Sequence, residues 1–186
     1  MSAGGGAPPR RSALLLALFS AYARRYVARH FHGVWVQGPA ALPPGPVLVV
    51  MNHPSWWDPL LGLLLAPRLG RRLHAAPWEA AALARYGLWE RLGAFAVRPG
   101  LEGTARFLVR GRAALARDDA ALWVTAQGRF VDARARPPGL RPGVGHLARA
   151  LDRGVVLPLA LEYAFWDERL PEAFARFGPP LPARDP

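Results

Sequence analysis

Short apolar segments alternate with amphipathic segments along most of the chain. The apolar segments have the length and the β-branched or aromatic content of buried strands. They lie at 34–38, 47–51, 93–97, 120–125, 155–164 and, as a last edge strand, 174–181. Helical patterns lie between them at 60–66, 77–92 with a break at Gly87, 101–117 and 144–152, and a basic link is expected at 69–72. This alternation predicts an α/β fold with a mainly parallel sheet flanked by helices.

The first 33 residues differ from the rest of the chain. Residues 1–9 are small and glycine-rich, and we expect them to be disordered. Residues 10–32 place a leucine-rich stretch between arginines, which favours an amphipathic helix lying in a membrane interface. The apolar stretch is shorter than the roughly 20 residues that cross a bilayer. An export signal and an ordinary helix packed on the domain are the alternatives.

The strand at 47–51 ends in a turn that carries candidate chemistry. Asn52 and His53 follow the strand, and Asp58-Pro59 has the form of a helix start in which Asp58 is the N-cap. An imidazole acts as a general base when one ring nitrogen is free and a carboxylate holds the other in the right tautomer. His53 and Asp58 have the residue types for this pair. The alternative is structural, with His53 exposed and Asp58 only capping the helix.

Composition narrows the possible partners. The formal net charge is +11, and every basic residue other than histidine is arginine, which predicts attraction to anionic lipid, phosphorylated substrates or nucleic acid. Nucleic acid is the weakest of the three, because no recognisable nucleic-acid-binding signature organises the arginines. With no cysteine, the chain has no disulfide, no thiolate metal site and no cysteine nucleophile.

Four motifs follow one another between residues 52 and 160. Asn52, His53 and Asp58 form the first, Gly93 to Arg98 the second, Gln127-Gly128-Arg129 the third, and the Val156-Leu-Pro-Leu159 strand the fourth. Their order resembles that of the glycerolipid acyltransferases, the family that includes lysophosphatidic acid acyltransferase. The resemblance implies that 34–186 is an acyltransferase domain, preceded by the membrane-associating segment at 1–33.

The family's chemistry is implied in the same way. His53 would deprotonate a lipid hydroxyl and Asp58 would orient His53, while an acyl-CoA or acyl-carrier-protein thioester supplies the acyl group. No metal and no other cofactor are implied. The residues implied to bind substrate are Phe95, Arg98, Gln127, Gly128 and Arg129. The implied location is the cytoplasmic side of the cell membrane, as a peripheral protein.

Two departures from the family pattern keep other functions open. The arginines of the second and third motifs, Arg98 and Arg129, each fall one place early, and glutamine stands at 127 where the family has glutamate. A lysophospholipid such as 1-acylglycerol-3-phosphate is the expected acceptor, and a glycolipid or carotenoid-type hydroxyl is the alternative. A basic membrane-surface module without catalytic activity is an alternative function. A serine hydrolase is disfavoured because the sequence has no Gly-x-Ser-x-Gly elbow. A zinc enzyme is disfavoured because the histidines lack the spacing of a zinc-binding helix.

Overall fold

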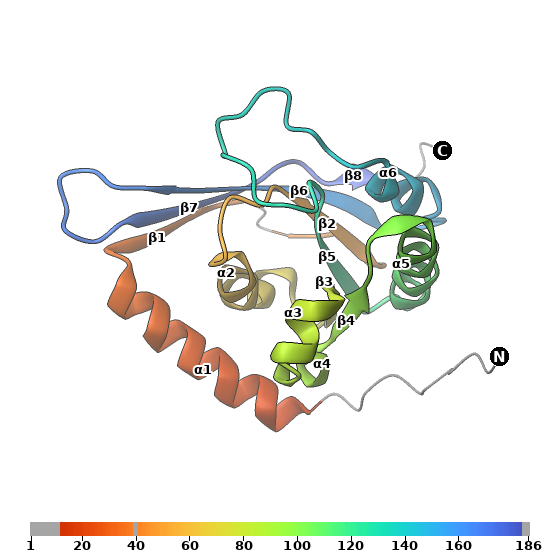
Figure 1. Ribbon diagram of the computed structural model, residues 1–186, viewed down its shortest axis with the longest axis horizontal. Coiled ribbons are helices and arrows are strands. Elements are labelled where there is room, and N and C mark those ends of the chain that lie inside the picture. The colour runs from red at the N-terminus through yellow and green to blue at the C-terminus, as the bar shows by residue number, and fades with distance from the viewer. Residues whose placement is uncertain (1–11, 39–40, 184–186) are drawn as a thin grey trace.

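The computed structural model describes residues 12–38 and 41–183 (Figure 1). The strands are β1 (Gly33–Gln37), β2 (Val47–Met51), β3 (Leu73–Glu79), β4 (Ala94–Val97), β5 (Ala120–Thr125), β6 (Val155–Ala164), β7 (Glu172–Phe177) and β8 (Leu181–Pro182). The helices are α1 (Ala13–His30), α2 (Asp58–Leu65), the 3₁₀ helix η1 (Ala66–Leu69), α3 (Ala80–Arg85), α4 (Leu88–Leu92), α5 (Gly100–Leu115) and α6 (Pro142–Arg149). The segment 1–9, expected to be disordered, and Arg10-Arg11, with which the alternative export signal would begin, lie outside the described residues.

One sheet joins all the strands, in the order β1-β7-β6-β2-β5-β3-β4, with β8 paired to β6. β2 pairs in parallel with both β5 and β6, and the β5–β3, β3–β4 and β1–β7 pairs are also parallel. The antiparallel pairs among the described strands are β6–β7 and β6–β8. The predicted fold class, a mainly parallel sheet flanked by helices, is therefore confirmed.

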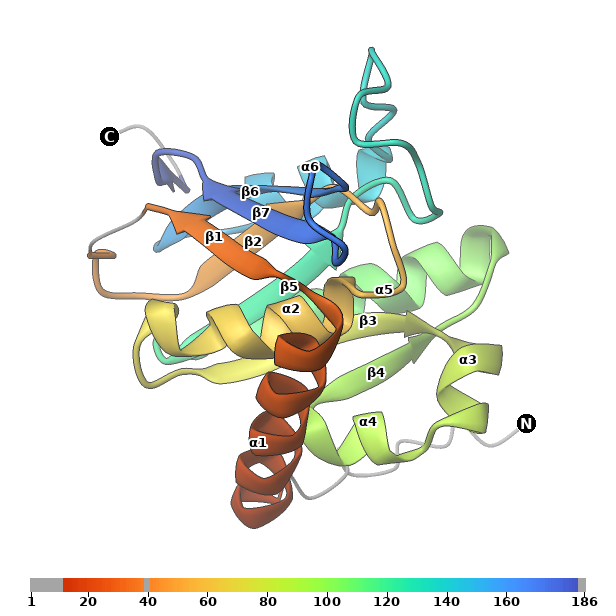
Figure 2. The same ribbon diagram turned by 90° about the vertical axis from the view of Figure 1, so that its left-hand side faces the viewer.

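Helices cover both faces of this sheet (Figures 1 and 2). Alternate residues of β2 point to opposite faces. Val47, Val49 and Met51 pack in one cluster with α1 and α2, whereas Leu48 packs in a second cluster with residues of α5 and α6. Because β2 is buried on both faces, its sequence is a continuous apolar run, as expected for a central parallel strand. The turn after β2 therefore begins from a strand that is packed on both sides.

The segment at 73–79 is the main error of the sequence-based prediction. The basic link predicted at 69–72 is present, apart from Leu69, between η1 and β3, but Pro77, which the sequence predicts to begin a helix, lies within β3, and the helix α3 begins at Ala80. Pro77 fits because Ala76 donates its N–H toward β4, at Gly93, so the backbone nitrogen of Pro77 faces the other side. Pairing with β5 has already ended at Ala75 on that side, so no ladder hydrogen bond is lost. The break predicted at Gly87 is present, between α3 and α4.

The C-terminal part of the sheet also differs from the prediction. A last edge strand was expected at 174–181, but β7 lies between β6 and β1, and β1 forms the edge. The β6–β7 hairpin turns in the loop 165–171, where the carbonyl of Pro171 accepts from His32 N–H at 2.8 Å. This contact brings the end of α1 beside the hairpin, so the first and last parts of the domain meet at one edge.

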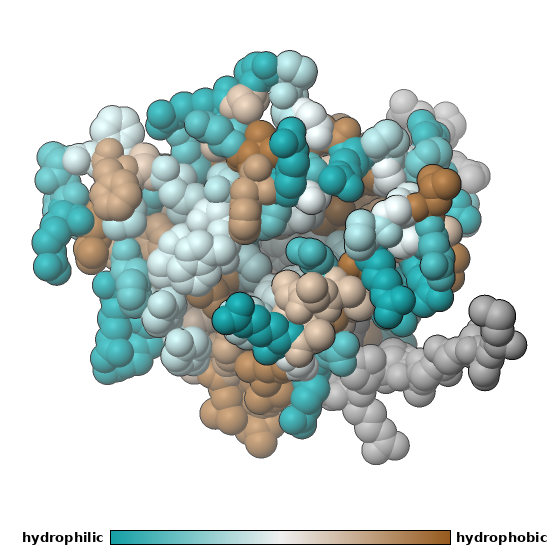
Figure 3. All heavy atoms as spheres, viewed as in Figure 1, coloured by the Kyte–Doolittle hydropathy of each residue, from teal (hydrophilic) through white to brown (hydrophobic). Residues whose placement is uncertain are grey.

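Helix α1 packs on the domain through one face only. Ala23 and Val27 are buried in the core, whereas Leu14, Leu18 and Tyr22 are more than half exposed, one helical turn apart. Figure 3 shows hydrophobic residues gathered where α1 begins. No helix within the described ranges combines the length and the hydropathy needed to cross a membrane. The helix therefore has both an ordinary packing face and an exposed apolar strip.

Candidate active site

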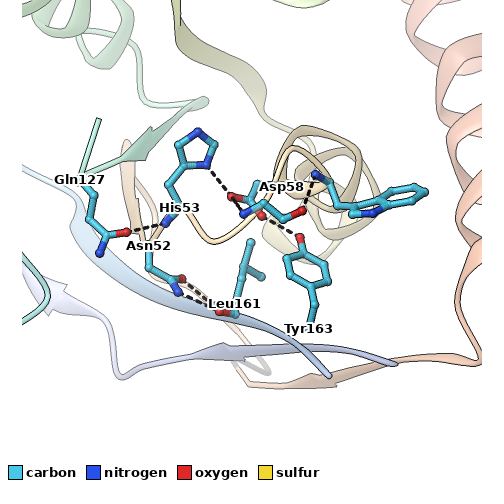
Figure 4. Close-up of polar contacts among 8 residues, drawn as sticks. Asn52, His53, Asp58, Gln127, Leu161 and Tyr163 are labelled. Atoms are coloured by element: carbon cyan, nitrogen blue, oxygen red, sulfur yellow. Dashed lines mark hydrogen bonds and ion pairs between the residues drawn. The ribbon is translucent and has the colours of Figure 1, made fainter. Parts of the chain in front are cut away.

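The site is built where three adjacent parallel strands, β5, β2 and β6, end. Asn52, the first residue after β2, extends the pairing with β6 through its side chain. Its Nδ2 donates to the carbonyl of Leu161 at 2.8 Å, and its Oδ1 accepts from the Leu161 N–H at 2.7 Å (Figure 4). An amide side chain can bond a backbone residue in this two-way manner because it carries a donor and an acceptor side by side. Asn52 thus fixes the place where the chain leaves the sheet.

Gln127 holds the next residue from the opposite side. Its side chain is 3% exposed, its Oε1 accepts from the His53 backbone N–H at 2.7 Å, and its Nε2 donates to the carbonyl of Pro138 at 2.6 Å. The carbonyl of His53 accepts from Val131 N–H at 3.0 Å. Both backbone polar groups of His53 are therefore bound by the segment that follows β5. The polar groups of Gln127 are both engaged with protein backbone.

The His53 and Asp58 side chains meet across the turn. His53 Nδ1 lies 2.6 Å from Asp58 Oδ2, and Asp58 is only 1% exposed. Because an ionised carboxylate only accepts hydrogen bonds, the proton of the neutral imidazole is on Nδ1, and Nε2 carries the free lone pair. In Figure 4 the second ring nitrogen points away from Asp58. This arrangement is the one required of a general base.

Asp58 does not cap α2 as the sequence suggested. It is the first residue of the helix, the N-cap position belongs to Trp57, and the helix has no side-chain cap. The Asp58 carboxylate instead faces the turn, where Oδ2 also accepts from Ser55 N–H at 3.4 Å. Pro59 stands in the first turn, where its missing N–H costs nothing. The negative charge at a helix N-terminus is favourable in itself, which helps to offset its burial.

Tyr163 of β6 completes the hydrogen bonding of Asp58. Its hydroxyl donates to Asp58 Oδ1 at 2.7 Å, so each carboxylate oxygen has its own side-chain partner. Burial raises the pKa of Tyr163 above its ordinary value, and the negative charge of Asp58 and the hydrogen bond to it act in the same direction. Tyr163 therefore stays protonated and remains a donor. The sequence analysis missed it; the one available signal was a tyrosine, with its polar tip, in a strand otherwise rich in aliphatic residues.

Phe130 was also missed, and it lies against the imidazole. The two ring centroids are 4.4 Å apart, and Phe130 itself is 59% exposed. The side chain of His53 is 20% exposed. A partly exposed aromatic ring over the histidine shields it from water while leaving access from the surface. The only hint in the sequence was a large apolar residue directly after Gly128-Arg129.

Among the described residues, no hydrogen bond, ion pair or ring contact joins the other predicted substrate residues to His53. Gly128 and Arg129 are exposed in the tight turn after β5, where Gly128 has φ +61°. Phe95 is half-buried in β4, packed against the second core cluster, and Arg98 is exposed just after that strand. β3 separates β4 from β5, so Arg98 is further along the sheet edge from His53 than Arg129 is. The binding roles of these four residues stay predictions.

The segment Glu102-Gly103-Thr104, which follows Arg98 at the start of α5, has a structural role. Gly103 is buried in the first turns of α5, and a Cβ there would collide with the backbone carbonyl of Arg98. Glu102 is paired with Arg106 one turn later along the exposed helix surface, at 2.7 Å. Within the described ranges, no group of three or more histidine, aspartate or glutamate side chains could hold a metal ion.

Comparison with known proteins finds similarity to solved structures but not to known sequences. No family model and no curated protein matches the sequence. The crystal structure of PlsC, the 1-acyl-sn-glycerophosphate (LPA) acyltransferase of Thermotoga maritima, is similar, with a TM-score of 0.59 and 16% sequence identity. The similarity covers 90% of this chain and 68% of that one. The order of the motifs and this structural similarity agree: the chain has the fold of a glycerolipid acyltransferase.

Proposed function

We propose that the protein is an O-acyltransferase that moves a fatty acyl group from a thioester to a lipid hydroxyl. The observation that carries this proposal is the His53–Asp58 contact of 2.6 Å at the carboxyl end of β2, with the second ring nitrogen directed away from the carboxylate. The similarity of the fold to that of PlsC supports the same reaction class. His53 is the proposed general base, and Asp58 orients it.

The proposed reaction needs no covalent enzyme intermediate. His53 Nε2 accepts the proton of the acceptor hydroxyl as its oxygen attacks the thioester carbonyl carbon, and Asp58 stabilises the imidazolium that forms. The new C–O bond forms, the C–S bond breaks, and the departing thiolate takes the proton from the imidazolium. The products are an ester and a free thiol, so charges and protons balance. The thioester is already activated and its thiolate leaves readily.

A serine hydrolase is less well supported by the local geometry. Ser55 is the serine closest to His53 in the chain, and its Oγ accepts from the Trp57 backbone N–H at 3.3 Å. The hydroxyl thus serves the turn that begins α2. No serine hydroxyl is recorded in contact with His53 among the described residues.

For the acceptor we propose a lysophospholipid such as 1-acylglycerol-3-phosphate, with acyl-CoA or acyl-carrier protein as donor. Of the two motif arginines, Arg129 is the better placed to hold a phosphate, because it follows β5, which pairs directly with β2, whereas Arg98 follows β4. Guanidinium groups present a fork of donors that matches phosphate oxygens. A glycolipid or carotenoid-type hydroxyl is the alternative, because the arginines of the second and third motifs are displaced by one residue.

The deciding experiment is an acyl-transfer assay on the purified protein. Labelled acyl-CoA and acyl-carrier protein are each incubated with 1-acylglycerol-3-phosphate, a lysophospholipid that lacks the phosphomonoester, and a glycolipid. We expect an ester product that depends on His53, with a loss of about 10²- to 10⁴-fold in rate for His53→Ala. Full product formation by the folded His53→Ala variant would overturn the proposal, and the product formed identifies the acceptor.

We propose further that the protein binds peripherally to anionic membranes through α1. Leu14 and Leu18 project from the helix with 71% and 61% exposure, and Arg25 and Arg29 are exposed further along it. Apolar burial and attraction to anionic head groups act together in such a helix. Sedimentation with vesicles of anionic lipid should be weakened at least tenfold for a Leu14→Ser/Leu18→Ser variant, about what losing two partly buried leucines costs. Val109→Ser, on the exposed surface of α5, is the matched control.

A further inference from the structure

Tyr163 contacts the proposed catalytic pair, His53 and Asp58, through the Asp58 carboxylate. Two side chains share the buried Asp58 carboxylate: His53 holds Oδ2 at 2.6 Å and Tyr163 holds Oδ1 at 2.7 Å. Tyr163 lies on β6, far from the motif in sequence, and its ring packs against Phe31 with centroids 5.8 Å apart. Its hydroxyl is therefore aimed at the carboxylate by a strand and a packed ring.

We propose that Tyr163 is a positioning residue of the acyl-transfer site, one that fixes the Asp58 carboxylate and takes up part of its charge so that His53 remains unprotonated and able to accept a proton. A hydrogen bond to a charged acceptor withdraws negative charge from it and is stronger than one between neutral groups. In a buried site the remaining charge on Asp58 acts on the imidazole with little screening. The less charge Asp58 retains, the less it stabilises the imidazolium.

Two titratable side chains form hydrogen bonds in this part of the described structure besides His53 itself. Asp58 of α2 contacts His53, and Tyr163 of β6 contacts Asp58. The segment after β5 contributes Gln127 and Phe130, neither of which titrates. From α1, Phe31 contacts Tyr163, while Tyr26 and His30 contact Trp57 rather than the carboxylate. Among the described residues, the polar contact that the Tyr163 hydroxyl makes is the hydrogen bond to Asp58, so its loss removes that bond and leaves the ring in place.

The substitution Tyr163→Phe removes the hydroxyl and keeps the ring. We expect Asp58 to concentrate its charge on the bond to His53, which favours the imidazolium. The acidic limb of the pH–rate profile should then move to higher pH by about half a unit or more, because losing part of a charged hydrogen bond changes a pKa by about this amount. The rate on the alkaline plateau should fall only several-fold, so the loss is greatest at low pH. Tyr86→Phe, at an exposed position after α3, is the matched control.

This inference rests on the proposed acyl transfer, and a second measurement separates the two. NMR titration of the His53 imidazole carbons requires no substrate, and in Tyr163→Phe its midpoint should move to higher pH relative to the wild-type protein. An unchanged or lowered midpoint would overturn the inference, because a merely structural tyrosine would either leave Asp58 in place or release it from His53. If the wild-type protein forms no ester but the midpoint rises, the proposed function fails while the role of Tyr163 in setting the state of His53 stands.

Discussion

Two groups of polar residues at the same edge of the sheet follow different physical rules. Around His53, the side chains of Asp58 and Gln127 are buried, those of Asn52 and Tyr163 are half-buried, and each is bound to a named partner at 2.6–2.8 Å. The arginines of the second and third motifs, Arg98 and Arg129, are exposed, and no ion pair to either is recorded among the described residues. The first group is fixed before any substrate arrives.

Burial determines which single substitutions will change the rate and the stability of the protein. A buried polar atom without a partner costs the full price of its desolvation, about 1–3 kcal/mol and more for a charge. An exposed arginine returns to water at little cost when its partner is lost. Changes in the buried group should therefore affect both rate and stability. Changes in the arginines should affect only the binding of an anionic substrate.

The strongest test of the buried group after removal of His53 itself is Asp58→Asn. The amide can donate its N–H to His53 Nδ1, which moves the imidazole proton to the other nitrogen and leaves no free lone pair for the acceptor hydroxyl. We expect a loss of about 10²- to 10³-fold in kcat, somewhat less than for His53→Ala, with binding of the acyl donor retained. Single-turnover acyl transfer measures the rate, and thermal unfolding checks that the variant folds.

A loss of activity that simply followed a loss of folded protein would contradict this interpretation. Asp118→Asn offers a matched control, because Asp118 is paired with Arg153 on the exposed surface at 2.6 Å. An exposed pair of this kind contributes about 0–1 kcal/mol to stability, so its rate and unfolding temperature should stay close to the wild-type values.

Gln127→Glu comes next in expected effect. The glutamate can still accept from His53 N–H, but its second oxygen would face the carbonyl of Pro138 at the place where Nε2 now donates at 2.6 Å. Two acceptors in contact repel, so we expect a loss of about 1–3 kcal/mol in the free energy of unfolding and a several-fold lower rate. Denaturant unfolding measures the first and the acyl-transfer assay the second.

The chain supplies a close control for that substitution. Gln37 also precedes a glycine with positive φ, Gly38 at +59° against Gly128 at +61°, but it is exposed at the end of β1. Gln37→Glu should change the free energy of unfolding by less than about 0.5 kcal/mol. Equal effects at positions 37 and 127 would mean that burial and the bond to Pro138 do not decide the outcome.

The parts of the site that the sequence predicted are those encoded locally. His53 and Asp58 are separated by four residues across one strand–turn–helix unit, so their approach follows from local geometry. Tyr163 reaches the same carboxylate from 105 residues away, because β6 happens to pair with β2. Strand pairing across such a distance depends on the whole packed sheet, and one sequence does not reveal it. Phe130 escaped prediction for the same reason, since its contact with His53 depends on how the segment after β5 returns to β2.

The fold shows the same division between strong and weak local signals. β2 and β5 are nearly continuous apolar runs, and β6 is one up to Glu162; all three are predicted at their observed bounds. β3 was missed because Pro77 and the alanines around it favour a helix start, whereas tertiary pairing with β5 and β4 decides the outcome. The sequence predicts the last strand, observed as β7, at the edge of the sheet, because no local pattern reveals that β1, from the start of the chain, pairs with its outer side.

The alkaline stability of the protein gives a smaller test of the buried group. Burial and Asp58 raise the pKa of Tyr163, so above about pH 10 the unfolded chain releases this proton while the folded protein keeps it. The folded state then holds more protons, and its free energy of unfolding falls by up to about 1.4 kcal/mol per pH unit from this group. Tyr163→Phe should lose that part of the slope in denaturant titrations between pH 9 and 11, whereas Tyr86→Phe should not.

The smallest expected effects belong to the arginines, and they separate the two positions. Arg129 follows β5, the neighbour of β2, while Arg98 lies beyond β3 at the end of β4. With a phosphorylated acceptor, Arg129→Ala should raise KM about five- to tenfold, roughly the 1–1.4 kcal/mol of one charge-assisted contact, and Arg98→Ala should raise it less than about twofold. Arg110→Ala, on the exposed surface of α5, controls for general charge. If all three variants bound the phosphorylated acceptor equally well, neither motif arginine would hold its phosphate, and the binding role proposed for Arg129 would be wrong.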